Sequence, residues 1–234
     1  MRITNTYIDS VWEASIDMKN DALRKIELEH GQGGRRPKKY HNSPHTQSVI
    51  DGVLSIGSLA LERGKIEPIV LPLLVIASSF HDIYYNPDFV GNPNARGENE
   101  RRSALMAREA MKRYTFLEET DYDFVERAIT STTVTSFSPK LIQDVDPNNY
   151  AFGILADADL SSFGMPPEKF AVFALAYLAE LRESHGQRTM QFLDGEFVLL
   201  QNHQWHTQEA SELFPHIEEN IETSRRLQTL FAVQ

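Results

Sequence analysis

The chain has 234 residues, no cysteine and a formal net charge of −10 at pH 7. This length is sufficient for one substantial hydrophobic core. The absence of cysteine excludes disulfides, cysteine-based zinc sites, iron–sulfur clusters and cysteine nucleophiles. The acidic balance argues against general nucleic-acid binding, which requires clustered Lys and Arg.

The longest apolar stretch is too short for a membrane span. It covers residues 69–77 and includes Pro72, whereas a transmembrane helix needs about 20 apolar residues. The start of the chain also lacks the apolar core of a signal peptide. We therefore expect no membrane association and a cytoplasmic location.

Apolar spacing predicts helices along most of the chain and no convincing strand, so the expected fold class is all-α. Residues 130–135 are polar and β-leaning, which leaves open whether a helix continues through them. Residues 84–97 and 139–150 are expected to be loops. The predicted helices cover about residues 10–30, 43–63, 72–82, 98–114, 121–130, 152–160 and 166–181, followed by helical pieces with breaks at Gly195 and Pro215.

Two helix starts have residues suited to capping. Ser43 suits the N-cap of the helix over residues 43–63, with Pro44 at its first position. Asp121 is expected to cap the helix over residues 121–130. Gly64 is expected to end the first of these helices.

The most informative stretch is the apolar helix that leads into His81 and Asp82. A buried carboxylate beside an imidazole costs about several kcal/mol unless a cation or a full set of hydrogen bonds compensates both groups. Neutral imidazole nitrogen and carboxylate oxygen are common ligands of divalent first-row metals. One His-Asp pair is a weak signal, so a metal site needs further ligands.

Three further residues are candidates to complete such a site. His45 lies in the first turn of its predicted helix, on the face that turns toward the core. His41 precedes the same helix closely enough to share a pocket. Asp157 and Asp159 are two acids in an apolar, helix-like segment, and one of them would complete a set of four.

The order of these residues is the pattern of the HD superfamily of metal-dependent phosphohydrolases. YHNSPH at residues 40–45 resembles the YHNxxH of cyclic-nucleotide phosphodiesterases, and ADLS at 158–161 resembles the motif that carries their last metal ligand. The wider layout resembles predicted HD phosphohydrolases of uncharacterised substrate more closely than it resembles the phosphodiesterases. It consists of FHDIYY at 80–85, NERRSA at 99–104 and DADLSSFG at 157–164.

The resemblance implies an HD-domain helical bundle. It covers about residues 35–190, which would form the core of a single domain spanning residues 1–234, with the N- and C-terminal helices packed on it. It implies that the metal ligands are His45, His81, Asp82 and Asp159. Asp159 is preferred because the family's ligand follows an alanine, and Asp157 is left to position a ligand or a water.

The implied activity is hydrolysis of a phosphate ester, in a nucleotide or another small phosphorylated metabolite. A metal ion lowers the pKa of a bound water and neutralises a phosphoryl oxygen. The nitrogen and oxygen ligands suit Mn²⁺, Fe²⁺, Co²⁺, Ni²⁺, Zn²⁺ or Mg²⁺ without selecting one. We expect His41 as the general acid, Asp82 in catalysis through the metal, and Glu100 as a base or orienting group.

The phosphate of the substrate would be met by side chains around the site. The candidates are Arg36 and Lys39 in a basic run, Arg101 in the helix after the loop, and Tyr84 directly after the His-Asp pair. Each has a simpler interpretation as a solvated or packed side chain.

Two alternatives stay open. No histidine lies between His81 and Asp159, and the next is His185, whereas the dinuclear-iron members of the superfamily use extra histidines there. This favours one protein-held metal, or a second ion held by Asp82 and water, and disfavours an iron-dependent oxygenase on the same fold. The other alternative is a non-catalytic module that binds a nucleotide or a protein partner. The oligomeric state does not follow from the sequence.

Overall fold

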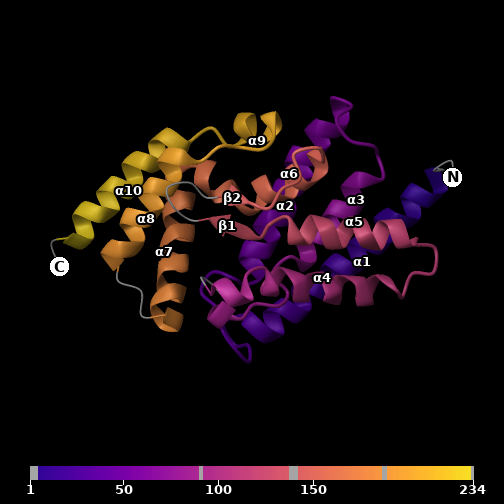
Figure 1. Cartoon of the computed structure of the whole chain (residues 1–234), viewed down its shortest axis with the longest axis horizontal. Helices are drawn as coiled ribbons and strands as arrows, with labels where there is room; N and C mark the ends of the chain where they lie inside the picture. Colours follow the sequence, from indigo (N-terminus) through magenta and orange to yellow (C-terminus); the bar gives the residue numbers. More distant parts are fainter. Residues whose placement is uncertain (1–4, 90–91, 137–141, 186–188, 233–234) are drawn as a thin grey trace.

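The computed structural model describes residues 5–89, 92–136, 142–185 and 189–232, and it is built almost entirely of helices (Figure 1). This confirms the all-α prediction. The helices are α1 (Asn5–His30), α2 (Ser43–Glu62), α3 (Val70–Phe80), α4 (Glu98–Met111), α5 (Glu119–Thr130), α6 (Tyr150–Asp159), α7 (Pro167–His185), α8 (Thr189–Asn202), α9 (Gln208–Leu213) and α10 (Ile217–Ala232). Short 3₁₀ turns lie at η1 (Pro87–Phe89), η2 (Pro93–Ala95) and η3 (Ser161–Gly164).

One small sheet departs from the prediction. The strands β1 (Val134–Ser136) and β2 (Ile142–Gln143) pair antiparallel, with Val134 opposite Gln143. The loop prediction for residues 139–150 was therefore wrong at residues 142–143, and residues 137–141 lie outside the described part of the chain. α5 ends at Thr130, and the β-leaning residues that follow lead into β1. These residues therefore end the helix and do not continue it.

Helix α3 is the centre of the main core. Every residue from Leu71 to Phe80 is buried, because α3 packs against α1, α2, α4, α5 and α6. A helix that is apolar nearly all round has no face for water, and such helices lie inside a domain. The polar end of α3 is carried into the interior as a consequence.

Helix α1 contributes directly to this core. Val11, Met18, Ala22 and Ile26 are all buried in the main hydrophobic cluster, on one face of a helix that packs against α3 and α2. The cluster thus extends beyond the core of residues 35–190 that the family resemblance implies.

The C-terminal helices form hydrophobic clusters of their own. Phe170, Ala174, Leu200 and Ile221 make one, and a second is centred on Leu193. Figure 1 shows α7, α8 and α10 side by side at one end of the molecule and α1, α3, α4 and α5 at the other, with α2 and α6 between them. Within the described residues, no helix is both long and apolar enough to cross a membrane.

The caps of α2 and α5 differ from the predicted ones. The N-cap of α2 is Asn42, whose side-chain oxygen accepts a hydrogen bond from the backbone N–H of His45, whereas the Ser43 hydroxyl donates to Glu27. The N-cap of α5 is Glu118, and Asp121 closes a capping box by accepting from the Glu118 N–H. In both cases the predicted cap is a short polar residue that lies one to three positions inside the helix.

Of the two helix breaks predicted in the C-terminal part, at Gly195 and Pro215, the structure has only the second. Gly195 lies inside α8, so the predicted break there was wrong. A helix tolerates one interior glycine at about 1 kcal/mol, and the buried Leu193 and Leu200 anchor α8 on both sides of it. Pro215 does separate α9 from α10, and Gly64 follows α2 with a φ of 66°, as predicted.

The carboxyl group of Glu196 generates a prediction about stability and pH. Glu196 is buried on α8, its Oε2 has no hydrogen-bond partner, and burial raises its pKa to about 8. Because the folded chain binds this proton more tightly than the unfolded chain, the contribution to stability is present below about pH 4.5 and is lost as the pH rises toward 8. Glu196→Gln should therefore unfold with a free energy about 1–3 kcal/mol higher than the wild type at pH 9.

Urea denaturation followed by circular dichroism at pH 5, 7 and 9 measures this difference. The exposed Glu218→Gln is the matched control and should show no such trend. A difference between Glu196→Gln and wild type that stays constant from pH 5 to pH 9 would contradict the assignment.

Candidate metal centre

Side chains from three helices meet at the end of α3. His45 comes from the first turn of α2, His81 and Asp82 follow α3 directly, and Asp159 ends α6. One ligand atom from each of the four lies within 4.8 Å of the other three. The structure thus brings together all four residues that the sequence nominated as ligands.

The distances among these atoms fit a shared cation. The Nε2 atoms of His45 and His81 are 3.4 Å apart, and each lies 3.2 Å from Asp82 Oδ2 and 3.5 Å from Asp159 Oδ1. Ligands bound at about 2.0–2.2 Å from one ion lie about 3.0–3.5 Å from each other. Two imidazoles and two carboxylates without sulfur also match the donor preference of divalent first-row metals.

The tautomer of His81 is fixed by its own helix. Its Nδ1 lies 2.7 Å from the carbonyl oxygen of Ser78, and a carbonyl can only accept, so Nδ1 carries the proton. The neutral ring therefore turns the lone pair of Nε2 toward Asp82 and Asp159. A backbone partner of this kind orients a metal-binding imidazole before any ion arrives.

The histidines and the aspartates of the cluster shift one another's pKa values. Burial favours neutral imidazole, yet Asp82 and Asp159 raise the pKa of both His45 and His81. Burial likewise favours a protonated carboxyl, yet His81 and His45 hold the pKa of Asp82 and of Asp159 below the usual range. The four groups therefore stabilise one another's charged forms, and a divalent cation would take over that role from the protons.

The cluster is open on its carboxylate side. The side chains of His45 and His81 are 4% and 1% exposed, whereas those of Asp82 and Asp159 are 17% and 20% exposed. A substrate would therefore approach past the carboxylates, with the imidazoles forming the floor.

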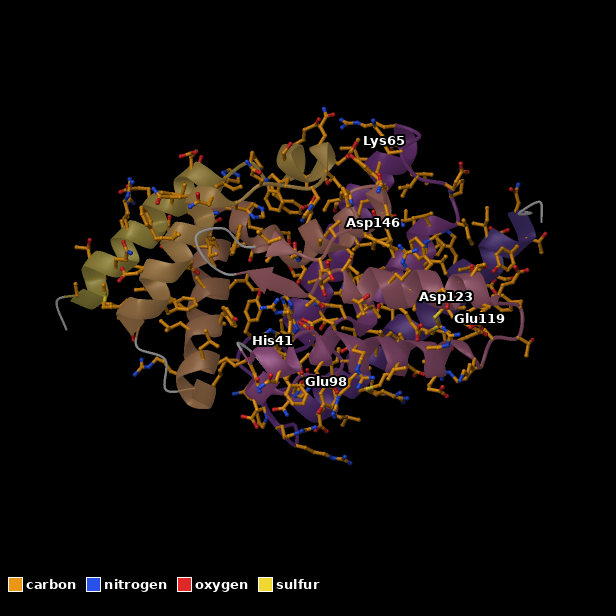
Figure 2. All side chains as sticks on the ribbon, in the orientation of Figure 1. His41, Lys65, Glu98, Glu119, Asp123 and Asp146 are labelled. Carbon is orange, nitrogen blue, oxygen red and sulfur yellow. The ribbon has the colours of Figure 1, made fainter. Side chains whose placement is uncertain are left out.

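His41 lies beside this cluster, between α7 and α4 (Figure 2). Its ring centroid is 5.8 Å from that of His45. Its Nδ1 is 2.5 Å from Glu180 Oε1, while Glu180 Oε2 accepts hydrogen bonds from the backbone N–H groups of Tyr40 and His41. Although Glu180 is buried, these bonds and the His41 ring lower its pKa to about 2, so it faces His41 as an anion.

Glu180 was missed by sequence reasoning. It lies on α7, on the same helical face as Phe173 and Tyr177, and both of those rings pack against Tyr40. An acid on an otherwise apolar stripe was the available signal, because a buried carboxylate requires a partner. Nothing local indicates which partner that is, since His41 is 139 positions away.

Aromatic rings surround His41 and His45. Tyr85 stacks on His41 with centroids 3.7 Å apart and an interplanar angle of 19°, and Tyr40 lies 4.4 Å from the His45 ring. Tyr84, the tyrosine predicted to contact substrate, instead accepts a hydrogen bond from Arg102 at 2.9 Å. The chain therefore presents Tyr85 rather than Tyr84 to His41.

The other nominated residues occupy separate places. Glu100, in the first turn of α4, has its pKa raised by burial and by the charges of Asp82 and Asp159, which places it near the cluster. Asp157 is buried and accepts hydrogen bonds from the backbone N–H groups of His206 and Thr207 and from the Thr207 hydroxyl at 2.7–2.8 Å. Its bonds thus hold the turn before α9.

The three predicted phosphate-binding cations are each paired with an acid. Arg36 Nε lies 2.6 Å from Glu29, Arg101 Nε lies 2.8 Å from Glu98, and Lys39 Nζ lies 4.0 Å from Glu183. All three cations are more than half exposed. The structure does not bring Arg36, Lys39 or Arg101 into the four-residue cluster.

Comparison with solved structures identifies proteins with a similar fold. No model of a known protein family and no curated protein matches the sequence. The phosphodiesterase domain of the RhoPDE fusion protein from the choanoflagellate Salpingoeca rosetta is similar with a TM-score of 0.65 and 14% identity, covering 100% of this chain and 95% of that one. The chain has the fold of this phosphodiesterase domain.

Two further solved structures have a fold similar to that of this chain. A second structure of the phosphodiesterase domain of the Salpingoeca rosetta rhodopsin phosphodiesterase has a TM-score of 0.62 at 15% identity, covering 99% of this chain and 88% of that one. LmjPDEB1 in complex with IBMX has a TM-score of 0.56 at 13% identity, covering 97% and 84%. The resemblance found in the sequence motifs is thus confirmed at the level of the fold.

The contrast between Asp159 and Asp157 generates a paired prediction. Asp159→Asn should lower Mn²⁺ affinity by at least about 100-fold, because it removes a donor from the cluster. Asp157→Asn should leave Mn²⁺ affinity within about threefold of wild type and lower the free energy of unfolding by about 1–3 kcal/mol, because Asn cannot accept all of the bonds from residues 206–207.

Metal content after dialysis and thermal unfolding of the metal-free proteins measure the two effects. Equal loss of Mn²⁺ in the two variants would contradict the separate placements of Asp157 and Asp159.

Proposed function

We propose that the chain is a metal-dependent hydrolase of phosphate esters of the HD type, acting on a nucleotide or another small phosphorylated metabolite. The observation that carries the proposal is the His41–Glu180 pair beside the four-donor cluster. A fold shared with phosphodiesterase domains supports it. The single-domain organisation and the cytoplasmic location remain predictions from the sequence.

The residues that would hold the metal are His45, His81, Asp82 and Asp159. Once bound, a divalent ion supplies an activated water and neutralises a phosphoryl oxygen. The chain's own part is to turn two imidazole nitrogens and two carboxylate oxygens toward one point, as the Ser78 carbonyl does for His81. The partly exposed carboxylates leave room for the substrate phosphate on that side.

His41 is suited to donate a proton to the leaving oxygen. Because Glu180 is an anion, Nδ1 of His41 carries a proton and donates it in the hydrogen bond. Nε2 is then the atom that can hold and release a second proton. The Glu180 carboxylate holds the His41 ring in this orientation, as a carboxylate does for a catalytic histidine elsewhere.

Glu100 and the aromatic side chains complete the proposed site. Burial and the charges of Asp82 and Asp159 raise the pKa of Glu100, and a raised pKa makes a carboxylate a stronger base toward water. Tyr85 stacks on the His41 ring and Tyr177 lies edge-on to it, so both tyrosines restrict the orientation of the proposed acid. The other predicted substrate contacts would each have to leave a present partner before meeting the substrate. These residues are Arg36, Lys39, Arg101 and Tyr84, which are paired with Glu29, Glu183, Glu98 and Arg102.

A metabolite scan tests the activity. Mn²⁺-loaded wild type and Asp82→Ala are each incubated with a mixed pool of nucleotides and phosphorylated metabolites, and the pool is analysed by mass spectrometry. Consumption of one compound by the wild type alone is the expected result. No consumption by a wild type that holds metal would overturn the proposal in favour of a binding module or an oxygenase, which iron content and oxygen uptake then separate.

His41 and its partner give a second prediction. His41→Ala should retain Mn²⁺ and lose about 10²–10⁴-fold in kcat, whereas His81→Ala should lose both Mn²⁺ and turnover. Glu180→Gln should retain Mn²⁺ and lower kcat, because the neutral amide cannot accept all of the hydrogen bonds that fix Tyr40 and the His41 ring.

Metal content and kcat on the substrate found in the scan are the measurements. If His41→Ala lost as much metal as His81→Ala, the role of His41 as acid would be wrong. An unchanged kcat in Glu180→Gln would remove Glu180 from the mechanism.

A further inference from the structure

Successive contacts lead from the cluster to Lys38, which belongs to the same basic run as Arg36 and Lys39. The His41 ring lies 5.8 Å from His45, and Tyr85 stacks on His41 at 3.7 Å. The Nζ atom of Lys38 lies 5.0 Å from the centroid of the Tyr85 ring. Lys38 and the proposed acid thus contact the same aromatic side chain.

The charge of Lys38 is only partly compensated. The side chain is partly buried, and burial lowers its pKa. The carboxylates of Glu180, Asp88 and Glu183 act on it, yet no carboxylate in the described part of the chain forms an ion pair with it, in contrast to Arg36 and Lys39.

The carboxylate with the strongest effect on Lys38 is already engaged. Both oxygens of Glu180 accept hydrogen bonds from Tyr40 and His41. A partly buried ammonium without a close anion has lost hydration that no partner restores. An anionic ligand would restore it, and a charge-assisted hydrogen bond is stronger than one between neutral groups.

The backbone of Lys38 is fixed on both sides. Its N–H donates to the carbonyl of His30 at 2.9 Å, and its own carbonyl accepts from Asn42 Nδ2 at 3.1 Å. Asn42 is also the N-cap of α2, the helix that carries His45. The lysine is therefore positioned by the same residue that starts the ligand helix, and this favours a defined role for Lys38 over that of a freely solvated loop cation.

We infer that Lys38 binds an anionic group on the leaving side of the substrate, so that the preferred substrates carry a second phosphate besides the one held at the metal. The inference rests on the proposed hydrolase function, in which His41 protonates the leaving oxygen. Lys38 contacts Tyr85, and Tyr85 stacks on His41, the residue proposed to protonate the leaving oxygen. Because this contact runs through the proposed acid and not through a metal ligand, we assign the group that Lys38 meets to the alcohol that leaves, not to the phosphate that is attacked.

Equilibrium binding separates this role from turnover. Mn²⁺-loaded full-length protein is titrated calorimetrically with adenosine 3′,5′-bisphosphate, adenosine 3′-monophosphate and adenosine 5′-monophosphate. The wild type is expected to bind the bisphosphate at least about tenfold more tightly than either monophosphate, as one charge-assisted hydrogen bond allows. Lys38→Met should abolish that preference and change the monophosphate affinities less than about twofold, and Lys38→Arg should keep most of it.

The matched control is Lys65→Met, the same change at an exposed lysine far from His41 in Figure 2, and it should bind all three nucleotides as the wild type does. A wild type without preference for the bisphosphate would overturn the inference. So would a preference that survives in Lys38→Met, or an equal loss for all three nucleotides. Failure of the proposed function is a separate result, because it appears as absence of turnover in the metabolite scan whatever the ratio of affinities.

Discussion

Burial of α3 is the constraint on which the candidate site depends. The helix is surrounded by α1, α2, α4, α5 and α6, and the removal of its apolar side chains from water stabilises the core at about 25 cal/mol per Å². The same packing moves His81 and Asp82 into the interior, where lone charges cost about several kcal/mol. His45 at the start of α2 and Asp159 at the end of α6 offset that cost, because His45 lies 3.2 Å from Asp82 and Asp159 lies 3.5 Å from His81.

Helix α7 supplies a second constraint from the opposite end of the molecule. Its buried Glu180 accepts hydrogen bonds from the backbone of Tyr40 and His41 as well as from the His41 ring. One carboxylate thus fixes both the path of the chain before α2 and the orientation of the proposed acid. The helices α8 and α10, which lie beyond the residues that the family resemblance covers, are connected to the site through α7.

Patterns within one helix predicted the structure well, and contacts between distant segments did not. The all-round apolar character of α3 and the inward face of His45 were readable because each depends on residues a few positions apart. Asp157 and Asp159, two positions apart on α6, project in different directions. The sequence resemblance preferred Asp159, which lies in the cluster, over Asp157, which binds residues 206–207.

Where the local sequence allowed more than one helix boundary, tertiary contacts determined which one formed. Asn42 and Ser43 are both good N-caps, and the choice follows from Glu27, which engages the Ser43 hydroxyl. Gly195 permits a break, yet burial of Leu193 and Leu200 keeps α8 continuous. Glu180 has one local signal, an acid on an apolar stripe, but this signal does not identify its partners, which are far away in the chain.

The acidic balance of the chain is compatible with an anionic substrate because electrostatic effects are local. At physiological ionic strength the Debye length is about 8 Å, so exposed acids on distant helices are largely screened from the site. Arg36 and Arg101 are paired with Glu29 and Glu98, and the carboxylates of the cluster would be offset by the metal. Lys38, beside Tyr85, forms no ion pair within the described residues, and a formal charge of −10 for the whole chain therefore says little about the sign of the potential that a phosphate would meet there.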